Sequence, residues 1–138
     1  MPSRRQDRLV VDTNLWISFL ISDSYHKLDQ HLPQNELKFL FSNELLSELL
    51  EVIRRPKFKR AFSPAIVNYL LDSIHCYSEL IEVNTKVDRC RDAKDNFLLA
   101  LCEDGQADCL LTGDIDLLSL EKHKKTKIIK ISDYLLLF

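Results

Sequence analysis

Glycine and proline are scarce in this sequence, which holds two of the former and four of the latter among 138 residues. Low-complexity and fibrous structures are therefore excluded. No apolar run approaches the roughly 20 residues that are needed to span a bilayer. The opening MPSRRQDR leads into an apolar run that is too short and too soon interrupted for a signal peptide. We expect a cytoplasmic protein that has no membrane partner.

An excess of charge of one sign is also lacking, since 19 lysines and arginines stand against 21 aspartates and glutamates and leave a formal net charge of −2. Any binding to nucleic acid therefore has to come from local patches rather than from the field of the whole protein. The four cysteines form no C-x-x-C pair, and the four histidines are scattered. A zinc site is not expected, and reduced cysteines then behave as small apolar residues.

The length suits one domain with a single sizeable core, so we assign residues 1–7 to a flexible N-terminus and residues 8–138 to the domain. Short β-rich runs alternate with segments whose apolar residues recur at helical spacing. Strands are predicted at 8–11, 37–41, 80–83, 108–114 (ending in a turn) and 127–131, and helices at 13–21, 43–55, 64–80 and 115–123, with a further helix ending near Gly105. Because right-handed crossovers place helices on both faces of a parallel sheet, this alternation predicts an α/β fold.

Two of the predicted strands end in aspartate. Asp12 follows LVV, and Asp114 follows CLLTG, with Asp116 two residues later. In open parallel sheets, ligands bind outside the carboxyl ends of the strands. An aspartate in a strand-to-helix turn can also simply cap the next helix, and that explanation suffices for either residue alone. Two of them on neighbouring strand ends favour a common site.

A third acid comes from the segment RDAKDNFLLALC, which places Asp92 and Asp95 three residues apart on one face near a helix N-terminus. We assign Asp92 mainly to capping this helix, where an acid is favourable. Asp95 lies further in, directly before the apolar run FLLAL. It is therefore predicted to point toward the end of the sheet rather than into open water.

A fourth acid is expected on the helix NELLSELLEVIRR, which offers Glu44, Glu48 and Glu51. At about 100° per residue, its leucine, valine and isoleucine residues fill one broad face. Glu48 borders that face, whereas Glu44 and Glu51 are predicted to point further away. A glutamate at the edge of a core-facing stripe can overhang the sheet or remain a surface acid, and Glu48 is the candidate.

Four carboxylates in one cleft repel one another by several kcal/mol at short separation in a partly dry site. They persist together only with a compensating charge. Because clustered histidine and cysteine are absent from the sequence, the chemistry points to Mg²⁺ or Mn²⁺, which prefer oxygen ligands. A centre of this kind favours hydrolysis of a phosphodiester.

Four segments of the chain resemble the PIN-domain proteins, in particular the small single-domain toxins (VapC-like) of type II toxin–antitoxin pairs. They are VVDTN, SNELLSELLEVIRRPKF, RDAKDNFLLALCEDGQADCLLTGDIDLL and KIIKISDYLL. The resemblance runs from about residue 8 to the C-terminus. It implies a three-layer α/β/α fold with a central, mainly parallel sheet. It also implies a ribonuclease site that binds Mg²⁺ or Mn²⁺ through three or four acids.

Carried over position by position, the resemblance assigns the catalytic, metal-binding acids to Asp12, Glu48, Asp95 and Asp114. It makes Asp116 a further direct or water-mediated metal ligand. Asn14 and Thr112 match polar positions that orient a ligand or water. Since members of the family commonly dimerise and are silenced by a partner protein, the implied partners are an RNA substrate, a cognate antitoxin and a second copy of the chain in a homodimer or higher homo-oligomer.

Two basic runs are candidates for RNA contact. The first is RRPKFKRAF (54–62), whose candidate RNA-binding residues are Arg54, Arg55, Lys57 and Lys59. Its two phenylalanines, Phe58 and Phe62, either offer a stacking face for bases or plug the core beneath a solvated loop. The second run is EKHKKTK (121–127), for which a solvated loop is the favoured interpretation.

The leading hypothesis is a metal-dependent endoribonuclease, the toxin of a toxin–antitoxin pair. The alternative is a regulatory or protein-binding module that keeps the fold without useful turnover. An aspartyl-phosphate phosphatase also begins with an aspartate at the end of a strand. That chemistry normally needs a second acid two residues on, where this chain has Asn14.

Overall fold

The computed structural model describes residues 6–22, 30, 36–59 and 62–136. Residues 1–5, which make up most of the predicted flexible N-terminus, lie outside the described residues. Asp7 begins the first strand, and its backbone N–H donates to the carbonyl of Glu36 at 2.9 Å.

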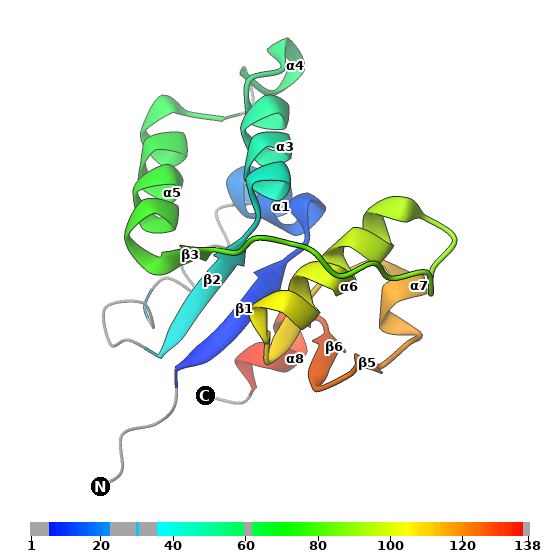
Figure 1. Ribbon diagram of the computed structural model, residues 1–138. Helices are drawn as coiled ribbons and strands as arrows, with labels where there is room; N and C mark the ends of the chain where they lie inside the picture. The colour runs from blue at the N-terminus through cyan, green and yellow to red at the C-terminus, as the bar shows by residue number, and fades with distance from the viewer. Residues whose placement is uncertain (1–5, 23–29, 31–35, 60–61, 137–138) are drawn as a thin grey trace, which may run out of the picture.

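A six-stranded sheet forms the middle of the molecule (Figure 1). Its strands are β1 (Asp7–Val11), β2 (Leu37–Phe41), β3 (Ser78–Leu80), β4 (Cys109–Leu111), β5 (Lys122–His123) and β6 (Thr126–Ile129). They lie in the order β3-β2-β1-β4-β6-β5. All neighbouring strands are parallel apart from β5 and β6, which are antiparallel. The prediction of a mainly parallel sheet is confirmed.

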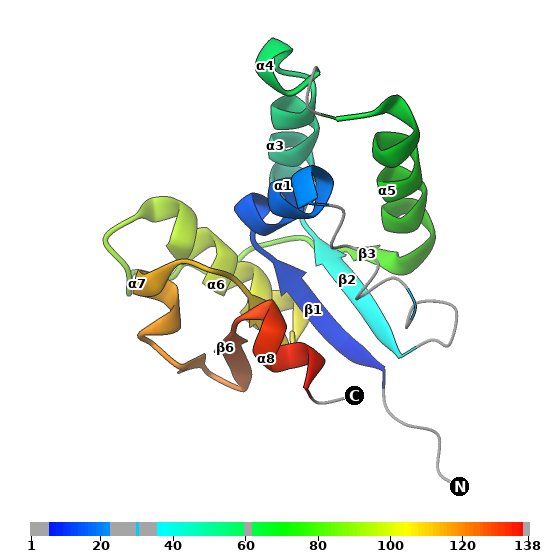
Figure 2. The ribbon, with the colours of Figure 1, turned by 180° about the vertical axis from the view of Figure 1, so that it is seen from behind.

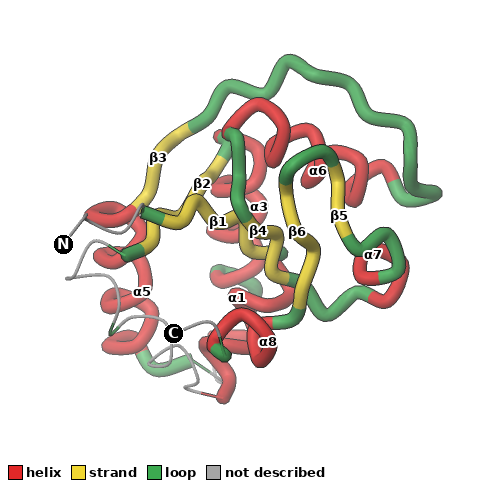
Figure 3. Tube along the Cα trace, turned by 90° about the horizontal axis from the view of Figure 1, so that it is seen from below, coloured by secondary structure: helices red, strands yellow, loops and turns green. Residues whose placement is uncertain are grey.

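Helices cover both faces of this sheet. The described helices are α1 (Thr13–Ser22), α3 (Asn43–Ile53), α4 (Pro56–Lys59), α5 (Pro64–Tyr77), α6 (Ala93–Gly105), α7 (Ile115–Leu118) and α8 (Ile131–Leu135). The long helix α6 lies on one face, and α1 and α8 lie on the other, which Figure 2 shows from behind and Figure 3 from below. The three-layer α/β/α fold is thereby confirmed. None of the described helices is long and apolar enough to cross a membrane.

The core lies between these layers. Leu9, Val10 and Val11 of β1 are each at most 2 % exposed, and all three residues of β4 are buried. Burial on both faces is what a parallel sheet with helices on each side requires. Trp16 of α1 packs edge-on against Phe39, with ring centroids 4.9 Å apart. This contact fixes α1 against the sheet directly after the end of β1.

Helix α6 approaches the sheet closely at its end, which explains one of the two glycines. A side-chain carbon placed on Gly105 would meet the end of the Leu40 side chain at 2.9 Å, so a larger residue there would require that side chain to shift. The left-handed backbone that ends the helix falls on the next residue, Gln106, at φ 53°. Gly105 therefore serves close packing, and the helix ends where the sequence predicts.

The predicted strand at 80–83 is wrong in its position, since β3 occupies Ser78–Leu80. Helix α5 ends earlier than expected, at Tyr77, because Ser78 is extended and bonds the carbonyl of Ile74 through its hydroxyl. Glu79 then pairs with Arg8 of β1, with 2.8 Å between Nη2 and Oε2. This ion pair places residue 79 in the edge strand, although the apolar residues predict that the strand begins at residue 80.

The predicted helix at 115–123 is also wrong in its length. Helix α7 ends at Leu118, and residues 122–123 form strand β5 of a hairpin with β6. The backbone of Glu121 is left-handed, at φ 65°, which a continuing helix does not allow. The last predicted strand, 127–131, becomes β6 at Thr126–Ile129, and Ile131 opens α8, which the sequence analysis did not predict.

Candidate active site

Asp12 is held at the carboxyl edge of the sheet by its own backbone. Its N–H donates to the carbonyl of Leu111 on β4 at 3.0 Å, which continues the parallel ladder by one residue. Its carboxylate Oδ1 accepts from the N–H of Asn14 at 3.3 Å, so it also caps α1. Capping occupies one oxygen of the carboxylate.

Thr112 joins this carboxylate to the next strand end. Its hydroxyl donates to Oδ2 of Asp12 at 2.9 Å and accepts from the N–H of Asp114 at 3.0 Å. Thr112 itself is only 1 % exposed. The side chain of one buried threonine therefore fixes the position of Asp12 relative to the turn that carries Asp114.

Asp95 enters the same region from the first turn of α6. It is 7 % exposed and is one of the few buried charged residues among those described. Burial raises the pKa of Asp95 to about 6, and negative charge on four nearby aspartates adds to the shift. These are Asp114, Asp92, Asp12 and Asp116. The predicted orientation of Asp95, toward the end of the sheet, matches its burial.

These acids line one cleft, which we call the acidic cleft, with a volume of about 410 Å³. Its walls come from α1, α3, α6 and the turn after β4. The polar residues that line it are Asp12, Thr13, Asn14, Glu44, Glu48, Asp92, Lys94, Asp95 and Asp114, beside the apolar Leu45, Ala93, Phe97 and Leu98. The four acids chosen from the sequence thus lie around one opening, although 102 positions separate Asp12 from Asp114 along the chain.

Helix α3 contributes two acids where the sequence analysis chose one. Glu48 lines the cleft as predicted, and Glu44 lines it as well, although it was predicted to point further away. Glu44 lies in the first turn of α3, close to the sheet edge where that helix begins. Glu51 does not line the cleft and lies 3.9 Å from Arg55.

Asp116 is the predicted metal ligand that the structure does not bring into the acidic cleft. Its backbone N–H donates to Oδ1 of Asp114 at 2.8 Å, whereas its carboxylate lies 3.5 Å from the guanidinium of Arg91. Both side chains are largely exposed. Asp116 thus positions the capping turn of α7 and is drawn outward by a neighbouring cation.

Two further residues line the cleft, and the sequence did not predict this position for either of them. Lys94 Nζ lies 3.6 Å from Oε1 of Glu48 at the cleft mouth. Asp92 caps α6 as predicted, accepting from the N–H of Lys94 at 2.9 Å, and in addition lines the cleft. The spacing of Asp92 and Asp95 contained the signal for the second role, because residues three apart share a helix face. No signal in the sequence pairs Lys94 with Glu48.

A second cavity reaches the same acids from another side. It has a volume of about 400 Å³, and Asp12, Asn14, Ser18 and Asp114 are among its lining residues. Asp12 and Asp114 therefore lie between two openings.

The donor set of the acidic cleft fits Mg²⁺ or Mn²⁺ in chemistry and in charge. Its polar lining is dominated by carboxylates, and their mutual repulsion, seen in the raised pKa of Asp95, is what a cation relieves. Within the described part of the chain, no three acidic, histidine or cysteine side chains already converge on one point as metal ligands do. Binding of a cation by these residues therefore requires their side chains to draw together.

The cysteines match the expectation from the sequence. Cys102 and Cys109 are buried, and burial raises the pKa of the Cys109 thiol to about 11. The thiols of these two residues stay protonated and apolar, and neither lines the acidic cleft.

The basic run at 54–62 lies at the end of α3 that is remote from the acids. Phe62 is 5 % exposed, and Phe58 stacks on it with ring centroids 5.3 Å apart. Of the two open explanations, the structure favours core packing over a stacking face for bases. Arg54, Arg55 and Lys57 remain exposed, whereas the side chain of Lys59 and residues 60–61 lie outside the described part.

Comparison with known proteins identifies the family of the chain. A family model described as a PIN domain matches residues 8–116. The chain is also 28 % identical over 127 residues to the uncharacterized protein MJ1680 of Methanocaldococcus jannaschii. That alignment covers 86 % of this chain and 77 % of the archaeal protein. The family match contains all four acids that were chosen from the sequence.

Proposed function

This chain belongs to the PIN-domain family, whose fold is of the nuclease type, and we propose that it is an endoribonuclease that depends on Mg²⁺ or Mn²⁺. The observation that carries the proposal is the acidic cleft, in which Asp12, Glu48, Asp95 and Asp114 line a single opening. Metal-dependent hydrolysis of RNA is common in the family and needs carboxylates in such an arrangement.

The contacts of the residues support the following proposed roles. Asp12 and Asp114 would hold the cation, since Thr112 fixes the first relative to the turn of the second. Asp95 and Glu48 complete the donor set from α6 and α3. Asn14, exposed beside Asp12, is placed to orient a phosphate or a water. The bound cation supplies charge neutralisation at a phosphoryl oxygen and activates water for attack.

The test is RNA cleavage by the purified protein. A labelled single-stranded RNA should be cut in the presence of Mn²⁺ or Mg²⁺ and should remain intact when a chelator is added. Glu48→Gln should lower the rate by at least about tenfold, because it removes one donor from the cleft. Glu51→Gln is the matched control, one helical turn further along α3, exposed and outside the cleft.

Equal rates for the parent and Glu48→Gln would contradict the assignment of this acid. An intact RNA under every metal condition would instead support the alternative, a regulatory or protein-binding module that retains the fold.

We also propose that the protein is the toxin of a toxin–antitoxin pair and acts as a homodimer or higher homo-oligomer. The support is the resemblance of its sequence motifs to small single-domain toxins. Expression of the parent should arrest growth, co-expression of the neighbouring gene should relieve the arrest, and Asp12→Asn should not arrest growth. Arrest by Asp12→Asn would separate toxicity from the acidic cleft.

A further inference from the structure

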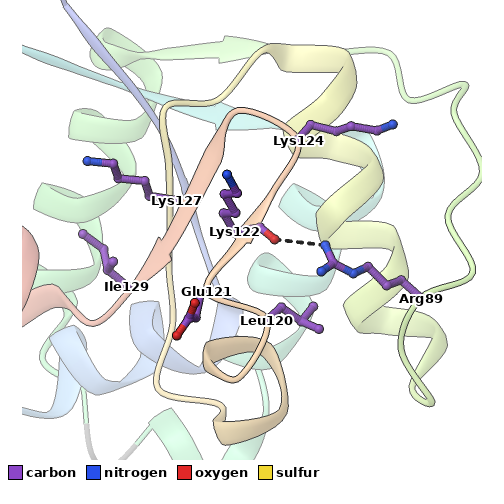
Figure 4. A pocket seen from close by; sticks show the side chains of 7 residues that line it. All are labelled: Arg89, Leu120, Glu121, Lys122, Lys124, Lys127 and Ile129. Carbon is purple, nitrogen blue, oxygen red and sulfur yellow. Dashed lines mark hydrogen bonds between the residues drawn. The ribbon is translucent and has the colours of Figure 1, made fainter.

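A third cavity, with the opposite charge, lies over the hairpin of β5 and β6, and Figure 4 shows it from close by. We call it the basic hollow. Its volume is about 730 Å³, and four cations line it: Arg89, Lys122, Lys124 and Lys127. Leu120 and Ile129 contribute apolar surface, and a single glutamate is the only acid in the lining. The lining of the hollow therefore combines four cations with two apolar side chains and one acid.

Among the described residues, no carboxylate lies within ion-pair distance of Lys122, Lys124 or Lys127. Lys122 and Lys127 are direct partners across the antiparallel ladder, where like charges are destabilising. In Figure 4 the three lysine side chains point in different directions around the hairpin. They are placed to meet several negative charges along a chain rather than one small anion.

Arg89 is fixed in place beside them. Its Nη1 donates to the carbonyl of Lys122 at 2.9 Å and lies 3.1 Å from Nδ1 of His123. The other ring nitrogen of His123 lies 2.7 Å from Oε2 of Glu103 on α6. These contacts tie the segment before α6 to strand β5, so the fourth cation is held in the lining of the hollow by the fold.

The basic hollow is adjacent to the acidic cleft along the chain. Arg89 lines the hollow and Asp92 lines the cleft, and three residues span at most about 11 Å. The other wall is continuous too, because α7 joins Asp114 of the cleft to Leu120 of the hollow. Two short connections of the chain therefore lead from the cleft to the hollow.

We propose that the basic hollow binds the sugar–phosphate backbone of single-stranded RNA beside the acidic cleft. This inference rests on the proposed function, since it takes RNA as the ligand. The physical need is clear, because a cleft rich in carboxylates repels a polyanion and cannot by itself hold the flanking phosphates. The cations of the hollow supply that attraction, and Leu120 and Ile129 offer apolar contact to ribose or base surface.

The experiment measures binding rather than cleavage. A fluorescent single-stranded RNA is titrated with the full chain in chelator, which prevents hydrolysis, at several salt concentrations. The variant Lys122→Gln/Lys127→Gln is compared with Lys125→Gln/Lys130→Gln, which removes the same charge from exposed residues outside the hollow lining. The hollow variant should bind at least about tenfold more weakly in 0.1 M salt, and its salt slope should fall by about 1.4, which is two phosphate contacts for a single strand.

Three results would overturn the inference: equal weakening by the two double variants, no weakening by the hollow variant, or no RNA binding by the parent. Displacement of the RNA by poly-glutamate of equal charge, lost in the hollow variant alone, would also overturn it and indicate an acidic protein as the ligand.

The hollow variant should melt no lower than the parent, because it relieves repulsion across the hairpin. Since no cleavage is measured, failure of the proposed ribonuclease activity leaves these readouts intact, and the two failures are distinguishable.

Discussion

The two ends of strand β1 differ in the groups that surround their charged side chains. At its start, Arg8 is neutralised by nearby groups. Its Nε donates to the carbonyl of Gly105 at 2.9 Å, and its Nη2 donates to Oε2 of Glu79 at 2.8 Å. The hydrogen bond from Arg8 lowers the pKa of Glu79. Charge at this edge of the sheet joins β1 to β3 and α6.

At the other end of the same strand, Asp12 faces further acids. Burial and like charge raise the pKa of Asp95 to about 6. A second comparison, within α6, gives the same contrast. Asp104 near the end of that helix accepts from the N–H groups of Asn84 and Thr85, and hydrogen bonds from Thr85 lower its pKa. The fold thus lowers the pKa of Glu79 and Asp104 through hydrogen bonds, whereas burial and like charge raise the pKa of Asp95 in the acidic cleft.

This difference indicates that the start of β1 serves stability and that its end serves binding. At the amino edge of the sheet, the charges stabilise the folded protein without any bound ligand. The carboxyl edge retains repulsion around Asp95, which a bound cation would reduce. A contrast of this kind between two edges of one sheet is expected when one edge is a functional site.

The largest expected effect is on activity, at the carboxyl edge. Asp12→Asn should lower RNA cleavage by at least about 100-fold, because it removes a cation ligand that is shared between two cavities. Its melting temperature should stay within a few degrees of the parent, since the amide still accepts from the N–H of Asn14. Cleavage rates and thermal melts check both parts. A folded Asp12→Asn variant that cleaves like the parent would show that the acids at the carboxyl edge of the sheet do not serve RNA cleavage.

The next effect is on stability, at the amino edge. Arg8→Met keeps the apolar stem but loses the bonds to Glu79 and Gly105, so the free energy of unfolding should fall by about 1–2 kcal/mol. Urea unfolding measures this loss. Cleavage per folded molecule should not change, because Arg8 lies outside both cavities that reach the acids. A large loss of activity without loss of stability would show that the two edges are not independent.

A smaller effect on activity is expected at Thr112. Thr112→Val removes the hydroxyl that joins Asp12 to the Asp114 turn, and the cleavage rate should fall about tenfold. Thr112→Ser keeps the hydroxyl and should retain most of the activity. Comparison of the two rates, together with the metal concentration that each variant needs for half its maximal rate, separates positioning of Asp12 from packing. Equal loss in both variants would assign the effect to packing.

The smallest effect is on the pH dependence of stability without metal. The folded protein binds the Asp95 proton more tightly than the unfolded chain, whose ordinary pKa is 3.8. The stability from this group is therefore present below pH 4 and is lost as the pH rises through about 6. Denaturant unfolding of the parent relative to Asp95→Asn should show a difference of about 1 kcal/mol between pH 5.3 and 7. A difference that does not change with pH would mean that Asp95 is not perturbed.

Much of the fold and of the site was predictable from local patterns. The apolar run before Asp12 gave β1, and Ser42 caps α3 as its position before that helix suggests, accepting from the N–H of Leu45 at 3.0 Å. The four acids were chosen because strand ends and helix faces follow from periodicity. Their convergence in one cleft required only the parallel order of the strands.

Other features depended on contacts between distant residues, which no local pattern contains. Strand β5 has only two residues, and His123 is held there by Glu103 and Arg89 from other elements. The outward turn of Asp116 depends on Arg91, which is 25 positions away. The basic run at 121–127 was interpreted as a solvated loop, and only the hairpin geometry shows that part of it lines a cavity with Arg89.

The central claim is that the acids at the carboxyl edge of the sheet form a site for a divalent cation. The most direct test is the melting temperature of the metal-free protein as Mn²⁺ is added, for the parent and for Asp95→Asn. Mn²⁺ at 100 times its dissociation constant should stabilise the parent by about 2.7 kcal/mol and should stabilise Asp95→Asn much less. No shift in the parent, or the same shift in both proteins, would contradict the claim.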